Sequence, residues 1–148
     1  MYAMTSTHPD IAYAVSLLAQ HTTKPSDEHW KAVKHVFRYL QGTRDLGITY
    51  SHLKPVDLVG YVDADYAGDK NSSRSMTGWA FLVAGGTVAW SLHKQETISL
   101  SSPEAEYVAI ASAARELVWI RQFLSELGFS PDGPTTMLTD NQSSIALA

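Results

Sequence analysis

The 148-residue sequence contains no cysteine, which excludes both disulfide-stabilised folds and zinc sites built on thiolates. We therefore expect a reducing compartment inside the cell. The sequence also lacks a secretory signal and an apolar run long enough to cross a membrane, so we expect no membrane partner. Its charged content is only 18%, and its 45% of hydrophobic residues are enough to bury a core.

Positive charge is scarce in the second part of the chain. Residues 56–148 carry five Lys/Arg against eleven Asp/Glu, whereas residues 1–55 carry six against four, together with five of the six histidines. Affinity for nucleic acid comes largely from neutralising phosphates, so the acidic part is unfavourable for binding unless divalent metal offsets its charge. We expect weak nucleic-acid binding from this chain alone.

Helical and strand patterns follow one another along the chain. The apolar periodicity predicts helices over residues 9–20 and 26–42, the second with Ser26 as its N-cap. Alternating apolar residues predict four strands, at residues 47–51, 58–63, 77–83 and 87–91. A hairpin turn is expected at Gly85-Gly86.

The C-terminal part begins with a long helical pattern that Ser102 caps and that runs to Leu127, where a break near Arg115 is left open. A short strand over residues 135–139 and the start of a helix over 143–148 follow. This order predicts an α/β fold. We expect residues 1–55 to form a helical segment and residues 56–148 a separate domain.

Three carboxylates stand where a fold can bring them together. Asp63 and Asp140 each follow an apolar strand pattern, and Glu106 lies in the opening turn of the long helix. Magnesium prefers oxygen ligands, and two such ions about 4 Å apart stabilise both the attacking and the leaving oxygen of a phosphodiester. The trio therefore predicts a site for Mg²⁺ or Mn²⁺. The alternative is structural: turn-forming aspartates and a glutamate that stabilises the helix dipole.

Other polar residues near the trio have simpler explanations. We expect Asp65 to form a turn, and the helix dipole alone accounts for Glu104. A calcium loop beginning at Asp63 fails because its fifth and twelfth positions are Ala67 and Arg74, which are not oxygen ligands. A serine hydrolase is not indicated either, because Ser102 lacks a glycine-flanked elbow and no histidine follows it.

Two groups of basic residues are candidates for contacting nucleic acid. On the second predicted helix they are Lys31, Lys34 and Arg38, and the alternative is a solvated helix face. Further along, His93 and Lys94 precede Gln95 in a segment that we expect to be a turn.

Several sequence blocks resemble the ribonuclease H region of copia-type retrotransposon Pol polyproteins. They are VGYVDADYAGD (59–69), RSMTG (74–78), SLHKQ (91–95), LSSPEAEY (100–107) and TDNQS (139–143). The upstream blocks THPDIAYAV (7–15), EHW (28–30) and RYLQGT (38–43) resemble the connection between the reverse transcriptase and the ribonuclease H of that polyprotein. The resemblance covers nearly the whole chain.

This resemblance implies a ribonuclease H-like mixed sheet flanked by helices and an endonuclease that hydrolyses the RNA strand of RNA–DNA hybrids. Asp63, Glu106 and Asp140 would be both catalytic and metal-binding: one ion activates water and the other stabilises the departing ribose oxygen. Contacts to ribose 2′-hydroxyls would select the RNA strand. The implied partners are the hybrid and the upstream reverse transcriptase, in the cytoplasm, a virus-like particle or the nucleus.

The family pattern continues past Ser143 into a further strand, a histidine-containing segment and a helix with a fourth carboxylate. The sequence given stops before them, so we expect a C-terminally incomplete domain with weak binding of a single ion and slow or no turnover. An exposed strand edge leads us to expect a homo-oligomer. Three hypotheses stay open: an active ribonuclease H, an inactive nucleic-acid-binding module, and a fold repurposed for protein interaction.

Overall fold

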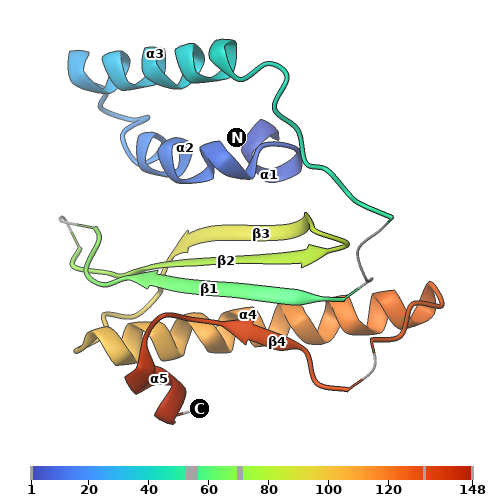
Figure 1. Cartoon of the computed structure of the whole chain (residues 1–148). Coiled ribbons are helices and arrows are strands. Elements are labelled where there is room, and N and C mark those ends of the chain that lie inside the picture. The colour runs from blue at the N-terminus through green and yellow to red at the C-terminus, as the bar shows by residue number, and fades with distance from the viewer. Residues whose placement is uncertain (1, 53–56, 70–71, 132, 148) are drawn as a thin grey trace. The chain divides into compact units, whose positions relative to one another are not determined.

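The computed structural model describes residues 2–52, 57–69, 72–131 and 133–147. The chain forms two compact units, Met1–Ile48 and Thr49–Ala148 (Figure 1). The boundary predicted between residues 55 and 56 lies outside the described residues and stays a prediction. Among the described residues, no helix combines the length and the apolarity that a membrane crossing requires.

The first unit is helical, as predicted. Its elements are α1 (Tyr2–Ser6), the short 3₁₀ helix η1 (Pro9–Ile11), α2 (Ala12–Ala19) and α3 (Asp27–Gly42). The N-terminus of α3 is fixed by a reciprocal cap: the backbone N–H of His29 donates to Ser26 Oγ, and the backbone N–H of Ser26 donates to His29 Nδ1. The sequence predicted this cap residue and the end of α3 but did not predict α1.

The second unit contains a four-stranded mixed sheet. Its strands are β1 (Val59–Asp65), β2 (Met76–Val83), β3 (Gly86–Lys94) and β4 (Thr136–Leu138), in the spatial order β3-β2-β1-β4. The pairs β1–β2 and β2–β3 are antiparallel, whereas β1 and β4 are parallel. The predicted α/β class and the mixed sheet flanked by helices are confirmed, and the architecture is consistent with a ribonuclease H-like fold.

Helix α4 (Ser102–Glu126) packs along one face of this sheet (Figure 1). The helix buries a stripe of alanines at a spacing of four, Ala105, Ala109 and Ala113, which allows its backbone to approach the strands closely. Opposite it lie Val62 of β1 and the fully buried Phe81 of β2. The resulting core determines which face of α4 lies against the sheet.

Several predicted boundaries were wrong. Residues 47–51 form no strand: Ser51 N–H donates to the Ala84 carbonyl, and the Tyr50 hydroxyl donates to the Thr87 carbonyl, so the segment lies against the β2–β3 turn without joining the ladder. That turn consists of Ala84 and Gly85, both with positive φ (52° and 81°), one residue earlier than predicted.

The long helix also differs from its prediction. Its N-cap is Ser101, not Ser102, because Ser101 Oγ accepts from Glu104 N–H at 3.3 Å. It continues through Arg115 without a break. The last helix, α5 (Gln142–Leu147), begins one residue earlier than predicted, and the predicted end at Ala148 lies outside the described residues.

Candidate metal centre

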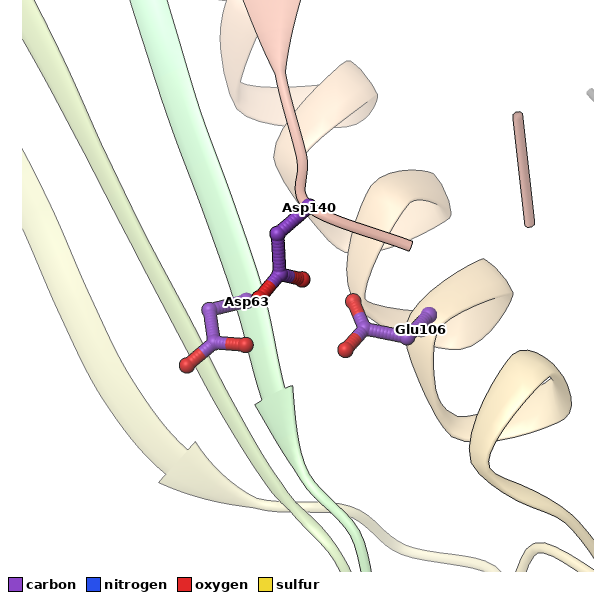
Figure 2. A group of neighbouring side chains, drawn as sticks. All are labelled: Asp63, Glu106 and Asp140. Carbon is purple, nitrogen blue, oxygen red and sulfur yellow. The ribbon is translucent and has the colours of Figure 1, made fainter. Parts of the chain in front are cut away.

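The three predicted carboxylates come together at one end of the sheet. Asp63 lies on β1, Glu106 in the second turn of α4, and Asp140 two residues after the end of β4. One carboxylate oxygen from each residue lies within 4.8 Å of the other two. Figure 2 shows Glu106 reaching from α4 toward the two aspartates. We refer to Asp63, Glu106 and Asp140 as the acidic cluster.

Strand length places the aspartates side by side. The parallel ladder between β1 and β4 ends at the pair Tyr61–Leu138, while β1 itself continues to Asp65. Asp63 therefore lies beyond the last residue that β4 covers. The chain after β4 places Asp140 near Asp63. Asn141 then precedes α5, and its Oδ1 accepts from Ser144 N–H at 3.1 Å.

Two acids near the start of α4 have different roles. The Glu104 side chain folds back toward the N-terminus of α4, where its Oε2 accepts from Leu100 N–H at 2.7 Å. Glu106 is two residues further on, a rotation that points it toward the sheet, and it is only 4% exposed. Capping explains Glu104, as predicted from the dipole, and it does not explain Glu106.

Burial gives Glu106 unusual electrostatics. Desolvation raises the pKa of its carboxyl, and the negative charges of Asp63 and Asp140 add to that increase. A hydrogen bond from the Ala64 backbone and the nearby Thr139 hydroxyl lower the same pKa, but the net shift is upward. Even so, among the described residues neither Glu106 Oε2 nor Thr139 Oγ1 has a hydrogen-bond partner of normal geometry.

These features fit a hard divalent cation. All the donor atoms of the acidic cluster are carboxylate oxygens, the ligand type that Mg²⁺ and Mn²⁺ prefer. A buried carboxylate oxygen without a partner is costly, and a cation beside it removes both that cost and the mutual repulsion of the three charges. Thr139 places its hydroxyl beside the Glu106 carboxyl and so also lies next to the acidic cluster.

Asp65 and Asp69 do not belong to the acidic cluster. Asp65 is exposed at the end of β1, close against Gly68 in the following turn, consistent with the predicted turn role. Asp69 is buried and forms an ion pair with Lys94 Nζ at 2.5 Å, while Ser72 also donates to its carboxylate. These contacts tie the loop after β1 to the end of β3.

The basic candidates fall into both units. The three on α3, Lys31, Lys34 and Arg38, are all exposed. His93 and Lys94 are the last residues of β3, so the predicted turn at this place was wrong. Burial and the charge of Arg115 lower the pKa of His93, which favours its neutral form. A role in binding nucleic acid stays a prediction for all five.

Comparisons with known proteins place the sequence among transposon proteins. It is 40% identical over its whole length to the retrovirus-related Pol polyprotein from transposon TNT 1-94 of Nicotiana tabacum and covers 11% of that protein. With the Pol polyprotein from transposon RE2 of Arabidopsis thaliana, it shares 41% identity over 91% of the chain and 9% of the relative. The chain thus spans about a tenth of the polyproteins that it matches.

A much shorter relative matches over most of its own length. The secreted RxLR effector protein 161 of Plasmopara viticola is 47% identical over 120 residues, which are 81% of this chain and 84% of the relative. No family model matches the sequence. No solved structure matches it either.

Proposed function

We propose that the chain, which is related to the retrovirus-related Pol polyproteins of copia-like transposons, carries their ribonuclease H function. The proposed reaction is metal-dependent hydrolysis of the RNA strand in an RNA–DNA hybrid. The acidic cluster is the proposed active site. In these relatives the matched region is a small part of a much longer polyprotein.

One observation carries the proposal. Three carboxylates from distant parts of the sequence converge within 4.8 Å, and the most buried of them has an oxygen without a hydrogen-bond partner among the described residues. A structural carboxylate in that position would need a donor, because burial penalises its charge. A shared divalent cation is the simplest occupant that satisfies all three groups.

The exposed and the buried carboxylates of the acidic cluster have different proposed roles. In the acidic cluster, Asp63, Glu106 and Asp140 would hold Mg²⁺ or Mn²⁺, which when bound supplies a nucleophilic water at neutral pH and stabilises charge on the phosphate. The exposed Asp63 and Asp140 present oxygens on the side from which a phosphodiester can approach. Glu106 would hold the ion from the buried side. Hydrolysis adds water to phosphorus and breaks its bond to the ribose 3′ oxygen, which receives a proton.

A cleavage assay tests this proposal. An RNA–DNA hybrid labelled on its RNA strand is incubated with the protein and Mg²⁺ or Mn²⁺, with a DNA duplex and a chelator as controls. We expect cleavage of the RNA strand in the hybrid alone, its loss in Glu106→Gln, and its retention in Glu104→Gln, which changes the neighbouring acid at the start of α4. Equal cleavage by wild type and Glu106→Gln would contradict the proposed site.

One comparison favours a second function. The effector protein of Plasmopara viticola consists of this region over 84% of its length, so the region also occurs as a small protein outside a polyprotein. A chain of that kind could use the fold to bind nucleic acid or another protein without catalysis. Binding of the hybrid, measured separately by fluorescence anisotropy, together with no cleavage in the assay above would support this alternative.

A further inference from the structure

Gln95 is a buried polar residue that the proposed reaction does not use. It follows β3, is 3% exposed, and uses both ends of its amide. Its Nε2 donates to Thr77 Oγ1 at 3.0 Å and to the Ala105 carbonyl at 2.9 Å. Its Oε1 accepts from Ser99 Oγ at 3.0 Å, and its backbone N–H donates to the Ser75 carbonyl at 2.9 Å.

These bonds join the elements that carry the acidic cluster. Thr77 lies on β2 directly opposite Ala64, the residue that follows Asp63 on β1. Ala105 immediately precedes Glu106 on α4. Through Thr77 and Ala105, the Gln95 side chain connects the strand next to Asp63 with the helical turn that bears Glu106.

The Ala105 bond is not needed to complete the helix. A carbonyl oxygen has two lone pairs, and inside an α-helix one of them accepts the N–H of the residue four positions later. Gln95 uses the remaining acceptor capacity, and it does so where α4 starts and where no preceding helical turn restrains the chain. Alanine packing alone permits the helix to slide or rotate by small amounts, whereas a directional hydrogen bond restricts both movements.

We propose that Gln95 is a positioning residue for the metal centre: its amide sets the place of Glu106 relative to Asp63. The proposal rests on the proposed function, because it gives the acidic cluster a metal to bind. Hydrogen-bonded groups behind metal ligands typically contribute a factor of 10 to 100 to metal affinity. Since Gln95 acts through the backbone of the neighbouring residue, we expect a loss of about 10-fold when its hydrogen bonds are removed.

The experiment measures Mn²⁺ affinity of the full chain by electron paramagnetic resonance of the free ion. Gln95→Met keeps the length of the side chain and removes its donors and acceptor. Thr77→Val keeps the shape of Thr77 and removes the acceptor on β2, and it serves as a second route if Gln95→Met does not fold. Ile120→Val is the matched control, because it weakens the core of α4 far along the helix from Glu106.

The outcomes separate positioning from mere stability. We expect Gln95→Met to bind Mn²⁺ about 10-fold more weakly than wild type and Thr77→Val to change in the same direction, while Ile120→Val lowers the melting temperature but keeps wild-type affinity. Wild-type affinity in a folded Gln95→Met or Thr77→Val protein overturns the positioning role alone. Failure of the wild type to bind Mn²⁺ overturns the proposed function and, with it, this inference.

Discussion

Replacing Asp63 with Asn tests whether the acidic cluster is one charged site. One carboxylate oxygen from each of its three residues lies within 4.8 Å of the other two. Two unit charges at that separation repel by about 1 kcal/mol in water and about 3.5 kcal/mol at an effective dielectric constant of about 20. The amide keeps the shape of the side chain and removes two of the three repulsive pairs. Because Asp63 and Asp140 are exposed, we expect the lower part of this range.

The metal-free Asn variant should therefore be more stable than wild type by about 1–2 kcal/mol at pH 8, a rise in melting temperature of roughly 5 °C. Metal should reverse the order. Wild type gains about 2.7 kcal/mol at a metal concentration of 100 times the dissociation constant, whereas the variant loses most of that gain. Thermal unfolding followed by circular dichroism, with a chelator and then with Mn²⁺, measures both effects.

Asp65→Asn is the matched control, because it changes a carboxylate on the same strand outside the acidic cluster. It should keep the wild-type response to metal. If Asp63→Asn and wild type gain equally from metal, the acidic cluster is not the binding site. If the metal-free Asn variant is less stable than wild type, the calculated repulsion is wrong.

Three further predictions concern Glu106, Lys94 and the basic candidates on α3. The folded state raises the pKa of Glu106 above the ordinary value of 4.5, so protonated Glu106 stabilises the fold at pH below 4.5 and this stabilisation is lost as pH rises through the folded pKa. Metal-free wild type should therefore lose stability over this rise in pH, whereas Glu106→Gln should not. Urea unfolding at a series of pH values measures this, and the same pH dependence in both proteins would refute it. Lys94→Met should lower the free energy of unfolding by about 1 kcal/mol, since it removes the ion pair of Asp69, and an unchanged urea midpoint would oppose this. The basic candidates on α3 are neutralised together by Lys31→Gln, Lys34→Gln and Arg38→Gln. Fluorescence anisotropy should then show that the slope of log affinity for the hybrid against log salt concentration is smaller by up to about 3. An unchanged slope would indicate a solvated helix face.

Much of the fold could be predicted because local signals agreed with the tertiary structure. Helix α3 has an unambiguous cap at Ser26 and a glycine at its end, and both boundaries were predicted. The N-cap of α4 was misplaced because Ser101 and Ser102 are both good caps, and only the bond to Glu104 distinguishes them. The β2–β3 turn was misplaced because Ala84 adopts a positive φ, which residues with a side chain normally avoid.

The proximity of the site residues could also be predicted, because each carboxylate follows a strand or opens a helix. The distances between the carboxylates could not be predicted, because they depend on where the β1–β4 ladder ends. Its last pair is Tyr61–Leu138, two residues before Asp63 on β1. Hydrogen bonds between residues far apart in the sequence could not be predicted either, because they also depend on the tertiary structure. Gln95 was only part of a predicted turn, and its hydrogen bonds to Thr77 and Ala105 exist only once the helix packs on the sheet.

The most direct test is to locate Mn²⁺ in crystals of the protein by anomalous scattering. A divalent metal centre predicts an anomalous peak between the carboxylates of Asp63, Glu106 and Asp140 and no such peak in crystals of Glu106→Gln. Well-ordered crystals grown in Mn²⁺ that show no peak at the acidic cluster, or a peak that persists unchanged in Glu106→Gln, would contradict the account.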